Sequence, residues 1–96
     1  GQGVVEAYSH HSGEIGSLVA VVCETDFVAK TKDFKDFVHE VAMQVAATNP
    51  SSVEKLLKQP WIRDEKKTIA SLLKLLSGKT GEKIEIKKIF RLDLKD

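Results

Sequence analysis

The spacing of apolar residues divides the chain into strands near its two ends and helices between them. Residues 3–10 are mostly β-branched, aromatic or small, which predicts a first strand. Residues 17–24 form a nearly continuous apolar run, which predicts a second strand, and the polar turn around Gly13 predicts a hairpin between the two. Residues 83–94 alternate between apolar and charged side chains and predict a third strand.

The second strand is apolar on both of its faces. The two faces carry Leu18, Ala20 and Val22 on one side, and Val19, Val21 and Cys23 on the other. Helices that cover one face of so small a sheet leave the other exposed, and an exposed apolar face of this kind is unusual for a monomer. We therefore expect Val19, Val21 and Cys23 to pack against a second copy of the chain, sheet on sheet, or against another domain. Cover by loops of the same chain is the alternative.

A long amphipathic helix is expected over residues 32–48, with Thr31 as its N-cap and the Asn-Pro pair at 49–50 as its end. Its apolar stripe contains Phe34, Phe37, Val38, Val41 and Val45. A short helix follows at residues 53–58, and Pro60 stops it.

The connection after the short helix holds two apolar residues, Trp61 and Ile62, which we expect to pack beneath it. Residues 64–67 are expected to form a charged turn. A third helix then begins after Thr68 as N-cap and ends near residue 77, at the glycines that follow.

The last strand breaks its own alternation at Lys88 and Ile89. One side would carry Ile84, Ile86, Phe90, Leu92 and Leu94. A β-bulge explains the break, and so does a second buried face that receives Ile89. The elements together predict an α+β fold, in the order strand, strand, three helices, strand. This is a small three-stranded antiparallel sheet with the helices packed on one face.

Length and composition fit one soluble globular domain over residues 1–96. Fifteen basic and fourteen acidic residues give a net charge of +1, which argues against bare duplex DNA as a partner. No apolar run is long enough to cross a membrane, and the single cysteine suits a reducing compartment. The chain begins at Gly1 without a methionine, so we expect part of a longer protein. Its location would be cytoplasmic, or organellar if a leader was removed.

The residue types that carry catalysis or bind metals do not fall into a recognisable arrangement. The S-G-K-T-G sequence at 77–81 lacks the earlier glycine of a phosphate-binding loop, because Leu73 stands there. His10, His11, His39 and Cys23 do not have metal-ligand spacing. No nucleophile–base or carboxylate pair is evident. We therefore expect no catalytic residue, no metal and no cofactor.

A mildly basic last strand, with Lys83, Lys87, Lys88 and Arg91, is the only feature that favours RNA. RNA-binding sheets carry interleaved aromatic residues, and only Phe90 and Tyr8 are candidates here. Direct nucleic-acid binding is therefore not expected.

The corner after the second strand holds Thr25, Asp26 and Phe27. A small polar residue there stops the strand and caps a helix. Two interpretations of the aromatic remain open on the residues alone. Phe27 is presented to a partner, or it is tucked under the long helix.

The segment C-E-T-D-F-V-A-K at residues 23–30 resembles the signature of the elongation factor Ts family. The likeness continues in the family's order along nearly the whole chain. Residues 5–19 (V-E-A-Y-S-H-H-S-G-E-I-G-S-L-V) are similar to its strand-turn-strand, and residues 38–50 (V-H-E-V-A-M-Q-V-A-A-T-N-P) to its following helix. Residues 59–69 (Q-P-W-I-R-D-E-K-K-T-I) are similar to its connection, and residues 81–94 (G-E-K-I-E-I-K-K-I-F-R-L-D-L) to its closing strand.

The resemblance implies a guanine-nucleotide exchange factor for elongation factor Tu that acts by binding and is not an enzyme. In this family the Asp-Phe pair enters the partner's G domain near the magnesium and phosphate site of the nucleotide. Carried over, Phe27 is the wedge and Asp26 a polar contact beside it. Thr25 and Val28 set the presentation. Gly81 is expected to lie close to the corner, and His10 matches a histidine implicated in contacts to another domain of the partner.

The resemblance covers the family's core domain only. The N-terminal helical domain has no counterpart in these residues, and the long helical insert is reduced to residues 51–58. Single-copy core domains in the family form homodimers by sheet-on-sheet packing, which agrees with the two-faced strand. A dimerisation or interaction module without efficient exchange activity is therefore the alternative function.

Overall fold

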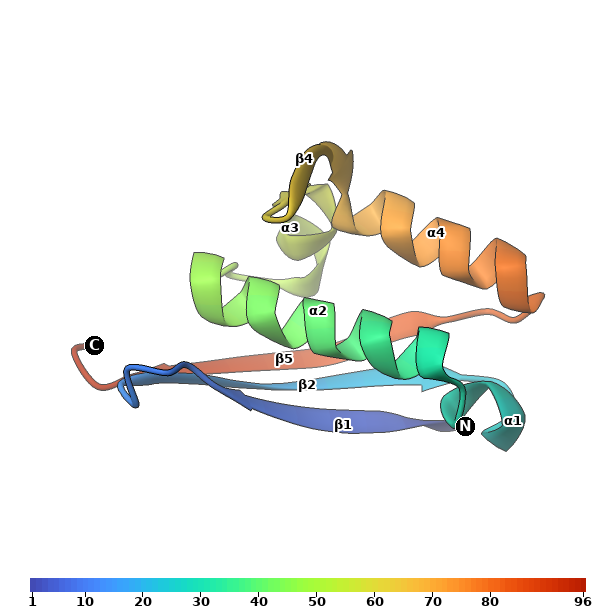
Figure 1. Ribbon diagram of the computed structural model, residues 1–96, viewed down its shortest axis with the longest axis horizontal. Coiled ribbons are helices and arrows are strands. Elements are labelled where there is room, and N and C mark those ends of the chain that lie inside the picture. Colours follow the sequence, from blue (N-terminus) through green and yellow to red (C-terminus); the bar gives the residue numbers. More distant parts are fainter.

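A three-stranded antiparallel sheet forms one layer of the molecule and helices form the other (Figure 1). The computed structural model describes residues 1–96. The sheet contains β1 (Gln2–Ser9), β2 (Ile15–Cys23) and β5 (Glu85–Asp93), in the order β1-β2-β5, so that β2 is central. The predicted α+β class, with a third strand from the far end of the chain, is confirmed.

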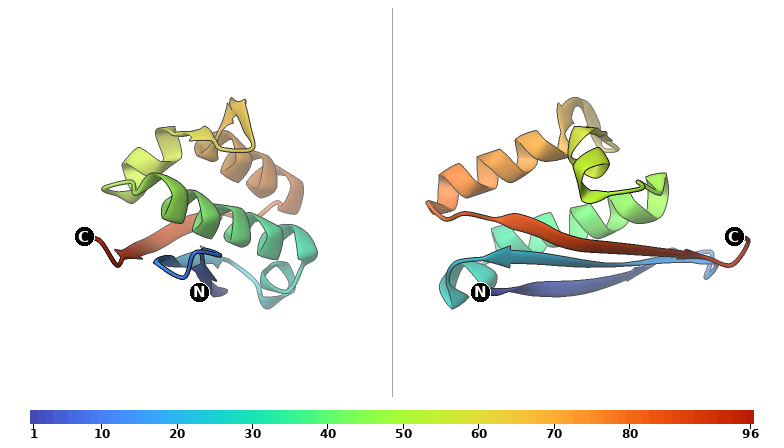
Figure 2. Two further views of the ribbon diagram at one scale, coloured as in Figure 1. Left: turned by 60° about the vertical axis from the view of Figure 1, so that its left-hand side comes forward. Right: turned by 180° about the vertical axis from the view of Figure 1, so that it is seen from behind.

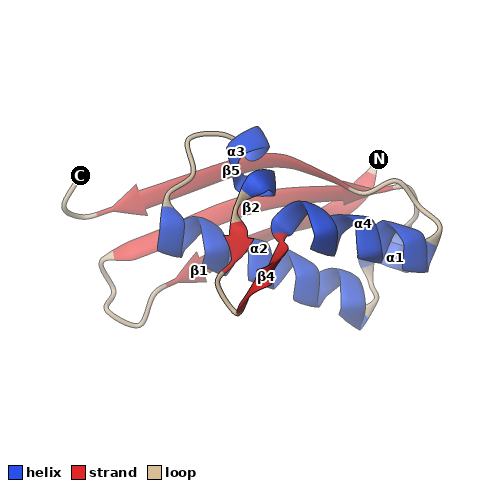
Figure 3. Cartoon of the chain, turned by 90° about the horizontal axis from the view of Figure 1, so that it is seen from above, coloured by secondary structure: helices blue, strands red, loops and turns tan.

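Two helices lie across the same face of the sheet, α2 (Lys32–Thr48) and α4 (Ile69–Thr80), as Figures 2 and 3 show. The short helices α1 (Asp26–Ala29) and α3 (Val53–Lys58) lie at the corner and in the connection. The predicted N-caps are confirmed, because the side chains of Thr31 and Thr68 accept from the backbone of the first turn of α2 and α4.

The third helix is longer than predicted. It passes through Gly78 and ends at Gly81, whose φ of 73° places it in the left-handed region that glycine adopts without strain. A Cβ at Gly78 would meet nothing, so this glycine marks no turn.

The predicted charged turn at 64–67 was wrong. This segment is β4 (Asp64–Thr68), which pairs with β3 (Pro60–Trp61) in a separate two-stranded hairpin. Its side chains are nearly all polar, so no apolar alternation marks it as a strand. Trp61 packs against the core as expected, whereas Ile62 lies in the turn of the hairpin and is exposed.

The two faces of β2 are the reverse of the prediction. Val19, Val21 and Cys23 pack beneath the helices and belong to a core cluster of 16 buried residues. Leu18 is 46% exposed on the opposite side, where no helix lies. Strict alternation shows which residues share a face, but it does not say on which side the helices will lie.

A β-bulge in β5 explains the broken alternation. The register shifts between Ala20, which pairs with Lys88, and Val21, which pairs with Ile86, so Lys87 is the extra residue. Ile89 therefore packs against the core beneath the helices, and the placement of Ile89 on the opposite face was wrong.

The uncovered side of the sheet is apolar at its centre. We call it the open face, formed by Val5, Leu18, Ala20, Phe90 and Leu92. Phe90 and Leu92 lie here because the bulge separates their phase from that of Ile84 and Ile86, with which they were predicted to align. An apolar face without cover was therefore predicted correctly, from the wrong residues.

No helix of the molecule has the length and apolar character to cross a membrane.

Candidate functional site

The corner after β2 is the feature that presents an aromatic side chain to solvent. The strand ends at Cys23, and Thr25 keeps an extended backbone with φ −123° and ψ 155° before the single turn of α1. Val28 and Ala29 are buried and hold α1 against the body of the protein. Phe27 points away from that contact and is 88% exposed, so the interpretation in which it is tucked under the long helix was wrong.

The Thr25 side chain links the corner to a distant segment of the chain. Its Oγ1 accepts from the Val28 backbone nitrogen at 3.3 Å, which is the N-cap bond of α1. The same hydroxyl donates to Glu82 Oε2. Glu82 Oε1 also accepts from the backbone nitrogens of Glu24 and Thr25, at 3.0 Å each. One carboxylate therefore receives three hydrogen bonds from the corner.

A reciprocal bond runs in the other direction. The Glu24 carboxylate accepts from the backbone nitrogen of Lys83. Residues 24–25 and 82–83 thus hold each other, and we call this set of four bonds the clamp. Gly81, the C-cap of α4, immediately precedes the clamp, and Figures 1 and 2 show the end of α4 and α1 at the same end of the molecule.

Asp26 is exposed beside the aromatic. Its carboxylate lies 2.8 Å from Lys30 Nζ, one helical turn further on, and both side chains remain largely in solvent. Such exposed pairs are weak, so the contact with Lys30 does little to hold the Asp26 side chain in place.

Two pKa values reflect the surroundings of the corner. The hydrogen bond from the Thr25 hydroxyl, with the two backbone donors, holds the pKa of Glu82 below its usual value. Burial raises the pKa of the Cys23 thiol, and the nearby Glu82 carboxylate adds to the effect. A buried thiol with a raised pKa is a poor nucleophile.

His10 lies at the opposite end of the sheet, in the turn between β1 and β2. Its Nδ1 lies 2.9 Å from Ser12 Oγ, and its ring contacts that of His11 with 4.0 Å between the centroids. The length of β2 separates it from Phe27, and strands extend by about 3.3 Å per residue. The predicted site residues therefore form two groups at the two ends of one strand.

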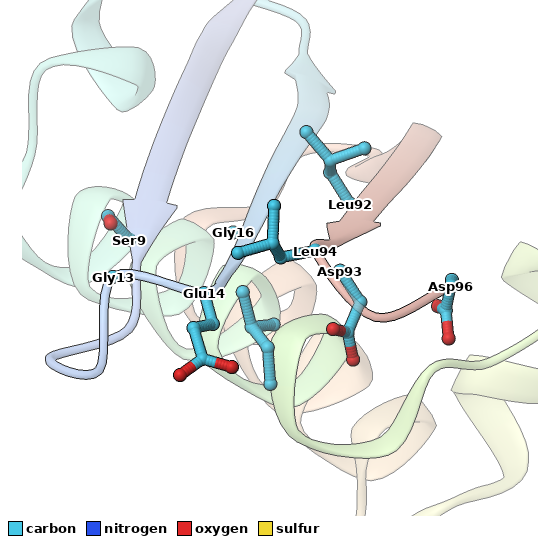
Figure 4. Close-up of a pocket in the computed structure, with 9 residues that line it drawn as sticks. Ser9, Gly13, Glu14, Gly16, Leu92, Asp93, Leu94 and Asp96 are labelled. Atoms are coloured by element: carbon cyan, nitrogen blue, oxygen red, sulfur yellow. The ribbon is translucent and has the colours of Figure 1, made fainter.

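A depression of about 480 Å³ adjoins the His10 end of the sheet, lined by the residues drawn in Figure 4. Its carboxylates do not converge, since Glu14, Asp93 and Asp96 are spread around it (Figure 4). Each is already bonded, Asp93 and Asp96 to Arg91 and Glu14 to Lys95. No group of three or more histidine, cysteine, aspartate or glutamate residues could hold a metal ion anywhere in the chain.

Sequence reasoning missed Glu82 and Glu24. Both stand in segments that resemble the family, but no local pattern indicates their bonds, because their partners lie 57 to 59 residues away. The available signal was indirect. The second strand has to end beside the start of the last one if the two pair antiparallel, and polar residues there can bond each other.

Comparisons with known proteins bear on this corner. The family model described as "Elongation factor TS" matches residues 24–96. Elongation factor Ts of Caldanaerobacter subterraneus subsp. tengcongensis is 34% identical over 137 positions, which cover 96% of this chain and 68% of the relative. That of Moorella thermoacetica is 33% identical over 138 positions, covering 97% and 68%. That of Desulfosudis oleivorans is 60% identical over 52 residues, 54% of this chain and 26% of the relative.

The alignment with the first relative is longer than the chain. It spans 137 positions against 96 residues, so at least 41 of its positions, the difference between the two, have no counterpart here. The predicted shortening relative to the family agrees with this difference.

Proposed function

Because the chain belongs to the elongation factor Ts family, we propose that it is a guanine-nucleotide exchange factor for elongation factor Tu. It would promote GDP release during translation elongation. It would act by binding and without making or breaking covalent bonds. The observation that carries the proposal is the exposure of Phe27 on a corner that is fixed to the body of the protein.

In the proposed mechanism, Phe27 enters the G domain of the partner near the magnesium and phosphate site. Asp26 makes a polar contact beside it, and Thr25 and Val28 fix the direction of α1. An aromatic anchor that is buried on binding often loses about 2 kcal/mol or more of binding free energy when truncated. A backbone that is ordered before binding loses less conformational entropy, which favours the clamped corner as the support of a wedge.

Exchange then follows from linked binding equilibria. The factor accelerates release when it binds the nucleotide-free partner more tightly than the nucleotide-bound one. By reciprocity, a nucleotide that binds the partner weakens its hold on the factor by the same ratio. In this mechanism no group on the chain has to transfer a proton or an electron.

We also infer a second contact through His10 and a homodimer through the open face. His10 would touch another domain of the partner, with β2 as the rigid spacer between the two contacts. The open face would pack against a second copy, sheet on sheet at about 10 Å.

Residues 1–96 would form one core domain that works in the cytoplasm, or in an organelle if a leader was removed. Gly81 would lie at the edge of the contact around Phe27.

Stopped-flow release of fluorescent GDP from elongation factor Tu tests the exchange function. We expect the wild-type chain to accelerate release and Phe27→Ala to reduce the acceleration by about tenfold or more. Leu75→Ala is the matched control, because Leu75 is a comparably exposed apolar residue on α4, away from the corner. Phe27→Ala with wild-type activity would refute the assignment of the wedge.

The alternative function is a dimerisation or interaction module of the same fold without efficient exchange. This alternative is favoured because the chain lacks positions that the first relative has. It predicts a wild-type chain that self-associates but leaves the rate of GDP release unchanged at any concentration.

A further inference from the structure

We propose that Glu82 is a positioning residue that sets the direction of Phe27 through Thr25. The proposal rests on the proposed function, in which Phe27 is the wedge. It is carried by the three hydrogen bonds that one carboxylate of the α4–β5 loop receives from the corner.

The backbone N–H groups of the corner bond to a side chain because the chain leaves the sheet at this point. The ladder between β2 and β5 ends at Val22, and that between β1 and β2 ends at Cys23. The N–H groups of Glu24 and Thr25 therefore have no strand partner, and both point to Glu82 Oε1. These bonds lie at the surface, where water can also satisfy the two donors, so what the carboxylate adds is a fixed direction for the corner.

The Thr25 hydroxyl connects the Glu82 carboxylate to the first turn of α1. A hydroxyl has one proton to donate, and Thr25 gives it to Glu82. The lone pairs of the same oxygen then face the Val28 N–H, which begins the helix. The carboxylate thus fixes the rotation of the hydroxyl and with it the start of the turn that carries Phe27. No acceptor of this strength would hold the proton if Glu82 were absent.

Glu82 is itself held by α4. The Ser77 hydroxyl donates to the Glu82 carbonyl at 2.5 Å, and the Glu82 N–H donates to Thr80 Oγ1 at 3.3 Å. Helix α4 is anchored in the core by Ile69 and Leu76. The direction of Phe27 is therefore fixed relative to the helical layer as well as relative to β2.

The turn that carries Phe27 cannot fix itself. Helix α1 has four residues, and isolated helices of this length are unstable in water. Burial of Val28 and Ala29 keeps α1 against the protein, so removal of Glu82 should leave the fold intact and loosen only the corner.

Amide hydrogen exchange of the free chain tests the positioning without any partner. In Glu82→Ala we expect the amides of Glu24, Thr25 and Val28 to exchange about tenfold faster or more, the size expected for lost bonds to a charged acceptor. Glu82→Gln keeps one acceptor oxygen and should give an intermediate result. Glu54→Ala removes an exposed carboxylate from α3 that has no bond to the corner, and it should change none of these amides. Unchanged corner amides in Glu82→Ala would overturn the proposal.

GDP release then shows whether Glu82 acts through Phe27. Glu82→Ala should slow factor-stimulated release about tenfold, with the same cooperative unfolding as wild type, and should have no further effect once Phe27→Ala is present. Equal losses from Glu82→Ala in both backgrounds would overturn the proposal. If Phe27→Ala itself is fully active, the proposed function fails, while the corner amides still decide whether Glu82 holds the corner.

Discussion

The two faces of the central strand carry similar side chains and have opposite environments. Val19 and Val21 are almost fully buried beneath α2 and α4, whereas Leu18 and the neighbouring Phe90 are about half exposed on the open face. The chemistry of the strand does not distinguish them. The difference lies in what the rest of the chain supplies, because both long helices reach the sheet from one side.

This comparison shows how a strand can serve two purposes at once. The covered face supplies the core, where each lost methyl group is costly. The open face contributes little to the stability of the single chain and stays available for a second surface. Four sets of substitutions or deletions test this division of roles.

The largest effect is expected for a charge on the covered face. Val21→Asp places a carboxylate at a position with 0% exposure and should unfold the chain, because an unpaired buried charge costs more than a small domain can offset. Leu18→Asp, on the open face, should leave the single chain folded. Circular dichroism and urea titration at low protein concentration measure both. A folded Val21→Asp chain would show that the covered face does not form a core that excludes charge.

The bulge in β5 offers a second test. Deletion of Lys87 removes the extra residue and leaves Ile86 and Ile89 beneath the helices, so the chain should stay folded. Deletion of Ile89 either reverses the faces of the residues that follow or places Lys88 beneath the helices. We expect it to cost at least about 2 kcal/mol more in the free energy of unfolding. Equal urea midpoints for the two deletions would contradict the assigned bulge.

Self-association should depend on the open face. Phe90→Asp introduces a charge beside Leu18 of the central strand and should weaken the proposed homodimer about thirtyfold or more, as loss of an interface anchor does. Leu75→Asp changes an exposed leucine of α4 and should leave the dimer intact. Sedimentation equilibrium gives the dissociation constants. A wild-type chain that is strictly monomeric at micromolar concentration would reject the dimer.

The smallest effect separates two serines. Ser17 is buried on the covered face and donates to the Ala42 carbonyl at 2.7 Å, so Ser17→Ala should lower the free energy of unfolding by about 1 kcal/mol. Ser9→Ala, at the exposed end of β1, should change it by less than about 0.5 kcal/mol. Urea unfolding measures both. Equal decreases in the free energy of unfolding would show that the buried Ser17 hydrogen bond stabilises the chain no more than an exposed serine does.

Local signals in the sequence were sufficient for most of the fold. The long helix begins and ends where Thr31 and Asn49 predicted, since caps and periodicity depend on neighbours in the chain. The β3–β4 hairpin could not be predicted because β3 has only two residues and the side chains of β4 are all polar, so neither strand shows an alternation. The covered face of β2 could not be predicted either, because the side on which the helices lie depends on the whole chain.

The candidate site divides in the same way. Thr25 as a cap follows from its position at the end of a strand, whereas the residues alone left open whether Phe27 is exposed, and the family likeness gives both a role. Glu82 could not be found from neighbours in the sequence. Its partners come near it only when the last strand pairs with the second.

The clamp also has a consequence for the order in which the protein folds during its synthesis. The hairpin of β1 and β2 joins close neighbours and can form early, whereas pairs such as Val22 with Glu85 wait for the final part of the chain. Glu82 follows Thr25 by 57 residues, so a nascent chain displays Phe27 on an unfixed corner until Glu82 has been made. The corner would thus become fixed only after β1, β2 and the four helices have been made.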